Sequence, residues 1–258
     1  MALAEASHDG RVATILLHRP EARNALSVDM CRALTDTLEE IRSSEARAVV
    51  VRGAGPAFCA GADFAAVSGA GGIEFLPAFE EMLETVAAFP LPTIASIQGA
   101  ALGGGLQLAT VCDFRIAADD AKLGIPAARL GIVVNYENVE RLVMLVGVAR
   151  AKEVLMTARQ YTGAEATTAG LVNRDVPAPE LERTTQELAA EIAALAPGSV
   201  RGAKRAIGLV ERRARSSGPA VAEIDVLVEA AYRSADLREG IASMRERRAP
   251  EFRGDESL

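Results

Sequence analysis

Hydrophobic residues along this chain alternate between short β-branched runs and longer segments with helical spacing. The short runs, rich in Val and Ile, are typical of strands, whereas the longer segments have apolar residues at every third or fourth position. This alternation predicts strands at residues 12–17, 47–52, 93–97 and 114–117, and helices at residues 28–43 and 73–89. The first three quarters of the chain therefore have the pattern of an α/β fold.

The first predicted helix has a recognisable start and a recognisable buried face. Ser27 precedes it and is a favourable N-cap residue, because its hydroxyl can accept a hydrogen bond from a backbone N–H of the first turn. The apolar positions that repeat on one side of this helix are Cys31, Leu34, Leu38 and Ile41. This spacing predicts a helix that packs one face against the core.

The last quarter of the chain has helical patterning, and no strand is predicted after residue 179. Two pairs, Thr162 with Glu165 and Asp236 with Glu239, have the spacing of a helix N-cap and its acidic N3 residue. We therefore predict an α/β core over residues 1–197, followed by a helical region over residues 198–258.

Composition and charge exclude several classes of protein. The chain has 258 residues and a formal net charge of −7, which disfavours a nucleic-acid-binding surface. Its two histidines, His8 and His18, lie near the N-terminus, and its three cysteines are far apart, so no metal site or disulfide framework is predicted. No apolar run is long enough to span a membrane and no targeting segment is recognised, so we expect a cytoplasmic protein.

Two loops of small residues carry the strongest chemical signal. FCAGAD at residues 58–63 and GAALGGG at residues 99–105 each follow a predicted strand. Glycine and alanine leave room for a ligand to approach the backbone closely. Two backbone N–H groups that face one carbonyl oxygen form an oxyanion hole, which stabilises developing negative charge on that oxygen.

At these residues the chain resembles the crotonase (enoyl-CoA hydratase/isomerase) superfamily. The resemblance runs nearly end to end through the two loops and through RPEARNAL at 19–26, CDFRIA at 112–117, LG at 130–131, RL at 141–142, GLVN at 170–173, AKR at 203–205 and RRAPEF at 247–252. It implies a spiral of ββα repeats that carries the acyl-CoA site. The C-terminal helices would mediate oligomerisation, giving a homotrimer or a dimer of trimers.

The resemblance also implies the site residues. The amides of Ala62 and Gly104 match the two oxyanion donors, and the ligand would be a coenzyme A thioester, with no further cofactor and no metal. Arg23 and Arg247 match positions where basic residues meet the coenzyme A phosphates, Arg247 reaching the ligand of a neighbouring subunit. The remaining substrate-binding positions expected in the first half of the chain are Ala25, Ala60, Asp63, Phe64 and Gln107.

Two acidic residues stand out beside these loops. Asp63 would also cap the segment that follows it, and a structural hydrogen-bonding role is expected for Asp113.

The chain departs from the hydratase pattern at two positions. Hydratases of this family have a glutamate two residues after the glycine triplet and another before the Leu-Gly pair, where this chain has Gln107 and Ala127. An amide cannot accept a proton from water near neutral pH, and alanine has no titratable group. The resemblance therefore supports acyl-CoA binding more firmly than it supports hydration.

Bulky polar residues replace a turn that is usually glycine-rich in the family. By resemblance, this turn lies beside the acyl end of the pocket, so Tyr136 or Glu137 could narrow the pocket or supply a replacement acid or base. Alternatively, Asn135 caps a helix and Glu137 occupies its first turn, where the helix dipole favours a negative charge.

The sequence leaves three hypotheses about function. The first is a fatty acyl-CoA-binding or carrier-type member of the family with weak or absent hydratase activity. The second is an active enoyl-CoA hydratase or isomerase that uses Glu137 as its acid/base. The third is a purely structural partner in a hetero-oligomer.

Overall fold

The computed structural model describes residues 2–63, 71–214 and 219–252, without the side chains of residues 71–73, 212–214 and 219–223. The chain divides into two compact units. Residues 1–123 and 161–213 form the first unit, and residues 124–160 and 214–258 form the second. This division differs from the expected boundary after residue 197, because an internal segment joins the C-terminal helices in the second unit.

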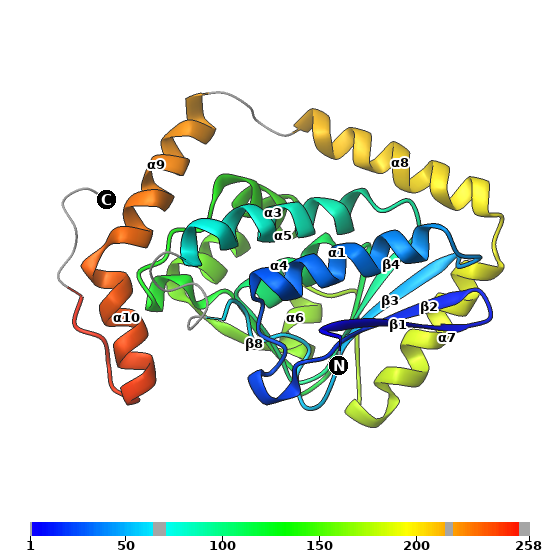
Figure 1. Cartoon of the computed structure of the whole chain (residues 1–258), viewed down its shortest axis with the longest axis horizontal. Helices are drawn as coiled ribbons and strands as arrows, with labels where there is room; N and C mark the ends of the chain where they lie inside the picture. The colour runs from blue at the N-terminus through cyan, green and yellow to red at the C-terminus, as the bar shows by residue number, and fades with distance from the viewer. Residues whose placement is uncertain (1, 64–70, 215–218, 253–258) are drawn as a thin grey trace. The chain divides into compact units, whose positions relative to one another are not determined.

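A six-stranded sheet forms the centre of the first unit (Figure 1). Its first two strands pair antiparallel, and the others continue the sheet in parallel. In sheet order the strands are β1 (Ala4–Asp9), β2 (Val12–Leu17), β3 (Ala48–Gly53), β4 (Thr93–Ile97), β6 (Phe114–Ala118) and β9 (Arg174–Val176). The four predicted strands are confirmed to within one residue at each end.

The central strands are buried on both faces, which explains their continuous apolar sequence. All five residues of β4 are buried, as are all but one of the six in β3. The edge strand β1 was not predicted, because Ala4 is its only buried residue and its sequence therefore lacks an apolar run. Strands with such polar sequences are recognised only through their pairing with a neighbour.

Helices cover both faces of this sheet (Figure 1). Helix α1 (Val28–Arg42) begins after Ser27, whose Oγ accepts a hydrogen bond from the Met30 N–H at 3.2 Å, as predicted. Helix α7 (Leu181–Ala194) packs on the opposite face, where Thr185 Oγ1 lies 3.2 Å from Ser96 Oγ of β4. The remaining helices of this unit are α3 (Gly71–Ala88), α4 (Gly104–Val111), α6 (Gly163–Thr168) and α8 (Pro197–Ala214), with 3-10 turns at Pro20–Ala22 and Ala178–Glu180.

The predicted capping box at Thr162 is confirmed. Its hydroxyl accepts a hydrogen bond from the Glu165 N–H at 3.2 Å, and the Glu165 carboxylate accepts one from the Thr162 N–H at 2.9 Å. The corresponding expectation for Asp236 is wrong. Ser234 is the N-cap of that helix, because its Oγ accepts from the Leu237 N–H at 3.0 Å, and Asp236 lies in the first turn.

The second unit is built from helices. They are the 3-10 turn Pro126–Arg129, α5 (Tyr136–Thr157), α9 (Pro219–Arg233) and α10 (Ala235–Glu246). Helix α5 is interrupted at Gly147, which has φ 74° and ψ 164°. Helix α10 packs directly on the turn after residue 129, since a Cβ on Gly240 would lie 2.6 Å from the Leu130 Cα.

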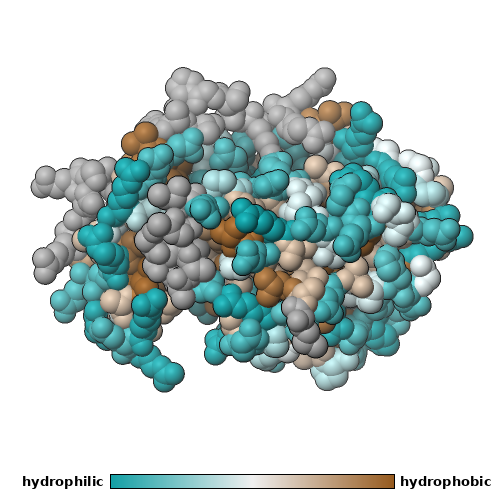
Figure 2. Space-filling model, in the orientation of Figure 1, coloured by the Kyte–Doolittle hydropathy of each residue, from teal (hydrophilic) through white to brown (hydrophobic). Residues whose placement is uncertain are grey.

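A second, three-stranded sheet has the order β5 (Ala100–Leu102), β7 (Lys122–Gly124) and β8 (Gln160–Thr162). After residue 179 the secondary structure of the described residues is helical, and none of them is in a strand. The surface seen in Figure 2 is mostly hydrophilic, with small hydrophobic patches. Among the residues placed by the structure, no helix is both long and apolar enough to cross a membrane.

Candidate functional site

Backbone hydrogen bonds join the loop after β3 to strand β5. The Cys59 N–H donates to the Ala100 carbonyl at 2.9 Å, and the Cys59 carbonyl accepts from the Leu102 N–H at 3.0 Å. This parallel bridge brings together the two small-residue loops that the sequence singled out.

A second bridge, between Leu26 and Ala62, orients the first expected donor. The Leu26 N–H donates to the Gly61 carbonyl and the Asp63 N–H donates to the Leu26 carbonyl, both at 2.8 Å. Successive residues of an extended segment turn their N–H groups to opposite sides. The Ala62 N–H therefore points away from this bridge, and it has no acceptor in the part of the chain that the structure describes.

Gly104 supplies the second expected donor. It is the first residue of α4, so its N–H has no acceptor within the helix and lies at the positive end of the helix dipole. A Cβ built on Gly61 would lie 3.6 Å from the Gly104 nitrogen, which shows how closely the two loops approach. The arrangement thus places two unused amides on adjoining segments, as an oxyanion hole requires.

The glycines at this junction are required by space and by backbone conformation. A Cβ on Gly105 would lie 2.1 Å from the Cys59 carbonyl oxygen, and one on Gly61 would lie 2.8 Å from that of Leu102. Gly61 also has a φ of 104°, which other residues rarely adopt. No side chain larger than hydrogen fits at either position without moving the backbone.

Apolar side chains lie close to Gly104. A Cβ on Gly104 would lie 3.2 Å from Leu26 Cδ1 and 3.3 Å from two ring carbons of Phe79. Phe79 stacks on Phe75 with a centroid separation of 5.4 Å. Gln107 is buried one turn along α4. Amides in such apolar surroundings interact more strongly with a developing negative charge than amides in water.

Asn24 supports the first loop, although no motif in the sequence gave it a site role of its own. Its side chain is fully buried and its Nδ2 donates to the carbonyls of Ala54, Ala57 and Phe58 at 2.9, 2.8 and 3.2 Å. Its Oδ1 accepts from the Arg19 N–H at 2.9 Å. Asn24 has a positive φ of 56°, which Asn adopts more readily than most residues. The residue type is therefore an indirect sign of this role in the sequence.

The remaining predicted residues of the first unit lie near this loop. The Ala60 N–H donates to the Arg23 carbonyl at 3.0 Å, while the Arg23 side chain is exposed. Asp63 Oδ2 lies 2.6 Å from Arg19 Nη1, so this carboxylate forms an ion pair beside the Ala62 amide. Ala25 is half-buried, and Phe64 lies outside the described residues.

The second unit contains an apolar cavity of about 480 Å³. Two predicted site residues, Ala127 and Tyr136, line it. The other lining residues are Ala128, Ile132, Val133, Val134, Val139, Leu155 and Ile224. Glu137 is not among them, and Arg247 is exposed at the C-cap of α10.

The helix-capping interpretation of the 135–138 segment is confirmed. Asn135 is the N-cap of α5, where its Oδ1 accepts from the Asn138 N–H at 3.4 Å and from Asn138 Nδ2 at 2.6 Å. Glu137 is half-buried in the first turn of this helix. The helix dipole stabilises a carboxylate at this place.

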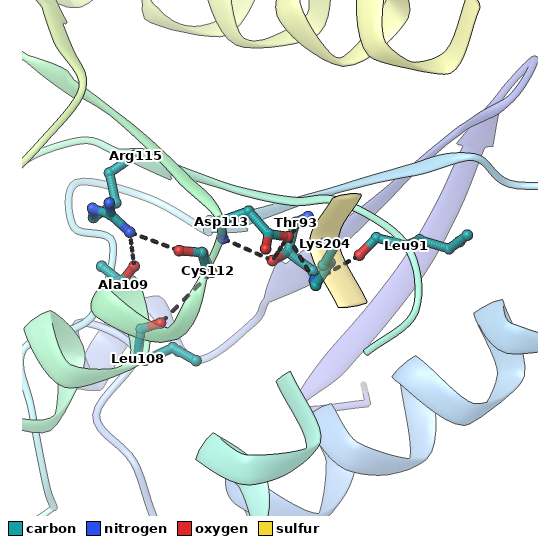
Figure 3. A network of polar contacts seen from close by, with 8 residues as sticks. All are labelled: Leu91, Thr93, Leu108, Ala109, Cys112, Asp113, Arg115 and Lys204. Atoms are coloured by element: carbon teal, nitrogen blue, oxygen red, sulfur yellow. Dashed lines mark hydrogen bonds and ion pairs between the residues drawn. The ribbon is translucent and has the colours of Figure 1, made fainter. Parts of the chain in front are cut away.

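A polar network joins the start of β4 to the end of α4 and to α8 (Figure 3). Asp113 Oδ2 accepts hydrogen bonds from Thr93 N at 2.7 Å and Thr93 Oγ1 at 2.9 Å, and from Lys204 Nζ at 2.6 Å. Lys204 also donates to the Leu91 carbonyl at 2.9 Å. The structural role expected for Asp113 is therefore confirmed.

The three cysteines are buried free thiols. Burial raises the pKa of each of Cys31, Cys59 and Cys112 to about 12, because the thiolate loses its hydration. Among the described residues, no three His, Cys, Asp or Glu side chains are grouped as a metal site would require.

Known proteins are similar to this chain over nearly its whole length. The family model for enoyl-CoA hydratase/isomerase matches residues 7–255. The enoyl-CoA isomerase/hydratase fer4 of Mycosarcoma maydis is 37% identical over 255 residues, covering 93% of this chain and 92% of that protein.

Solved structures have the same fold. An enoyl-CoA hydratase/carnithine racemase from Magnetospirillum magneticum is 32% identical with a TM-score of 0.79, and the match covers 99% of this chain and 97% of the other. A methylmalonyl-CoA decarboxylase complexed with 2S-carboxypropyl-CoA is 25% identical with a TM-score of 0.90, with 98% of each chain covered. The expected crotonase fold is confirmed, and the chain belongs to the enoyl-CoA hydratase/isomerase family.

Proposed function

We propose that this protein binds a fatty acyl-CoA thioester, whose carbonyl oxygen accepts hydrogen bonds from the amides of Ala62 and Gly104. The observation that carries the proposal is a pair of amides that have no acceptor among the described residues, on two loops that hydrogen bonds hold together. A thioester oxygen is the kind of acceptor that such a pair stabilises. The solved decarboxylase with this fold, complexed with a CoA compound, supports the ligand class.

The protein would act mainly as an acyl-CoA-binding member of its family, with weak or absent hydratase activity. Proton transfer to or from water needs a positioned titratable group. The positions where the resemblance expects two carboxylates are occupied by Gln107 and Ala127, neither of which can exchange a proton near neutral pH. Glu137, the alternative acid/base, lies in the first turn of α5, and its interaction with the helix dipole is enough to explain a carboxylate there.

Charge at the surface would complete ligand recognition. Arg23 and Arg247 are both exposed, so their guanidinium groups are available to phosphate groups of coenzyme A. A homotrimer or a dimer of trimers would bring Arg247 to a neighbouring subunit's ligand. We propose cytoplasmic localisation, and no cofactor beyond the thioester itself.

Calorimetric titration with an acyl-CoA series, free coenzyme A and free fatty acids tests the binding proposal. We expect acyl-CoA to bind more tightly than either fragment, because only the thioester presents both a polarisable carbonyl and phosphates. A ligand present at about 100 times its dissociation constant should raise the unfolding free energy by about 2.7 kcal/mol. Absence of heat and of thermal stabilisation would exclude acyl-CoA binding and leave a structural role.

Turnover of crotonyl-CoA separates a binding protein from an enzyme. We expect hydration at or near the uncatalysed rate. Robust turnover by the wild-type protein would contradict the weak-activity proposal while leaving the oxyanion hole intact.

A further inference from the structure

Arg115 is a buried cation at the end of the helix that carries the Gly104 amide. Its side chain is 5% exposed, and its Nη1 donates to the carbonyls of Cys112 at 2.6 Å and Ala109 at 3.4 Å (Figure 3). Its Nε donates to the Leu171 carbonyl at 3.0 Å. The guanidinium therefore ties the C-terminal end of α4 to the segment that precedes β9.

This cation is held by carbonyl groups rather than by a carboxylate. Its hydrogen bonds go to backbone oxygens, and no ion-pair partner is found for it among the described residues. Burial lowers the pKa of Arg115, which shows the cost of desolvating this charge. The last carbonyls of a helix have no intrahelical donor and carry partial negative charge, so they are suitable partners for a buried guanidinium.

The contacts of Asp113 with Thr93 and Lys204 hold the residue after the C-cap of α4, whereas the Arg115 guanidinium bonds to carbonyls of the last helical turn itself. Leu106, Leu108 and Ala109 are fully buried, and the hydrophobic contacts that they make are non-directional. Such packing permits small shifts along the helix axis that hydrogen bonds resist. The eight residues of α4, Gly104 to Val111, correspond to about 12 Å of helix, so a rigid α4 transmits a displacement of one end to the other.

We infer that Arg115 is a positioning residue of the acyl-CoA site, which fixes α4 so that the Gly104 N–H points at the thioester oxygen. This inference rests on the proposed acyl-CoA binding. Removing the guanidinium would leave the Ala109 and Cys112 carbonyls without this donor at the far end of the helix. A misplacement of about 1 Å at a reacting or polarised group can cost on the order of 10²-fold in function.

The carbonyl stretching frequency of a bound saturated acyl-CoA, labelled with ¹³C at the thioester carbon, reports this positioning directly. Wild-type protein should lower the frequency, because hydrogen bonds from the two amides polarise the carbonyl. At saturating ligand, Arg115→Met should lose about half of this shift and bind about 10-fold more weakly. Arg115→Lys should be intermediate, because one ammonium keeps the charge but cannot reach both α4 and Leu171.

Thr185→Val is the matched control, because it also removes a buried polar contact, with Ser96 and the Leu181 carbonyl, but does not touch α4. It should lose stability and keep the full carbonyl shift. A folded Arg115→Met or Arg115→Lys variant with the wild-type shift would overturn the inference, and the lysine variant decides the question if the methionine variant does not fold. Wild-type protein that binds no acyl-CoA would instead overturn the proposed function, and this inference with it.

Discussion

Asn24 Nδ2 lies 2.8 Å from the carbonyl oxygen of Ala57, in the turn that leads into the loop carrying Ala62. The same nitrogen lies near two further carbonyls, and Asn24 itself belongs to the segment that bridges to Ala62. The buried side-chain amide of Asn24 therefore joins the segment that bridges to Ala62 with the turn that precedes the Ala62 loop. A buried carbonyl left without its donor costs about 1–3 kcal/mol.

Replacement of Asn24 should destabilise the protein in two separable ways. Asn24→Gly keeps access to a positive φ but loses the side-chain donor, and we expect a loss of about 2–3 kcal/mol in urea unfolding. Asn24→Ala adds the cost of the left-handed conformation, about 1–2 kcal/mol more. Both variants should bind acyl-CoA more weakly. Wild-type stability in Asn24→Gly would show that the Asn24 hydrogen bonds contribute nothing.

A side chain at Gly104 should block the proposed oxyanion hole. Gly104→Val places methyl groups where a Cβ alone already lies 3.2 Å from Leu26 and 3.3 Å from Phe79. We expect acyl-CoA affinity to fall by at least about 10-fold in a folded protein, measured by titration calorimetry. Gly202→Val is the control, since a Cβ there meets nothing within 4 Å and the residue is likewise helical. Equal affinity in the two variants would show that Gly104 serves packing only.

Carboxylates at two positions should create hydratase activity. Gln107→Glu combined with Ala127→Glu restores the groups that the family resemblance places there, and general acid/base assistance contributes about 10²- to 10⁴-fold per group. We expect measurable hydration of crotonyl-CoA by the double variant and near-background hydration by the wild type. Absorbance at the enoyl-thioester band follows the reaction.

Glu137→Gln provides the comparison for that experiment. It should leave both binding and background turnover unchanged, because Glu137 lies in the first turn of a capped helix. If the wild type is active and this substitution abolishes turnover without weakening binding, Glu137 is the acid/base and the weak-activity proposal is wrong.

The buried thiols predict a loss of stability at alkaline pH. Their pKa is about 12 in the folded protein against an ordinary value of 9.0, so unfolded chains release these protons first as the pH rises. Each thiol should then reduce the unfolding free energy by about 1.4 kcal/mol per pH unit between about pH 9 and 12, with no effect below pH 9. Cys112→Ala should show a shallower decline over this range, measured by urea unfolding. If the unfolding free energies of wild type and Cys112→Ala fell equally steeply with pH, this result would contradict a raised pKa for Cys112.

Lys204 should anchor α8 through its contacts with Asp113 and the Leu91 carbonyl. The Lys204 side chain is 15% exposed, so Lys204→Met leaves a mostly buried carboxylate without its cation and should cost about 1–3 kcal/mol. Proteolysis within α8 should become faster. Arg205→Met, at the exposed neighbouring position, should stay within about 0.5 kcal/mol of wild type. Similar stability of the two variants would refute the anchoring role.

Local sequence determined the elements whose signals lie within a few residues. The β-branched run of β4 predicts its strand because both faces of that strand are buried, and Ser27 and Thr162 predict helix starts because a capping side chain bonds within its own turn. The local spacing at Asp236 was misleading, because Ser234 offered a competing cap two residues earlier. The small-residue loops were visible in sequence, since only glycine permits such close backbone approach.

Tertiary structure decided everything that depends on residues far apart in the chain. The polar edge strand β1 exists through its pairing with β2, and Asn24 and Arg115 bind carbonyls 30 to 34 and up to 56 residues away, respectively. A backbone carbonyl has the same chemistry at every position, so no residue type marks which carbonyl a buried side chain will meet. The Cys59 and Leu26 bridges bring the amides of Ala62 and Gly104, the proposed oxyanion donors, onto adjoining segments, a relationship that spacing along the chain does not encode.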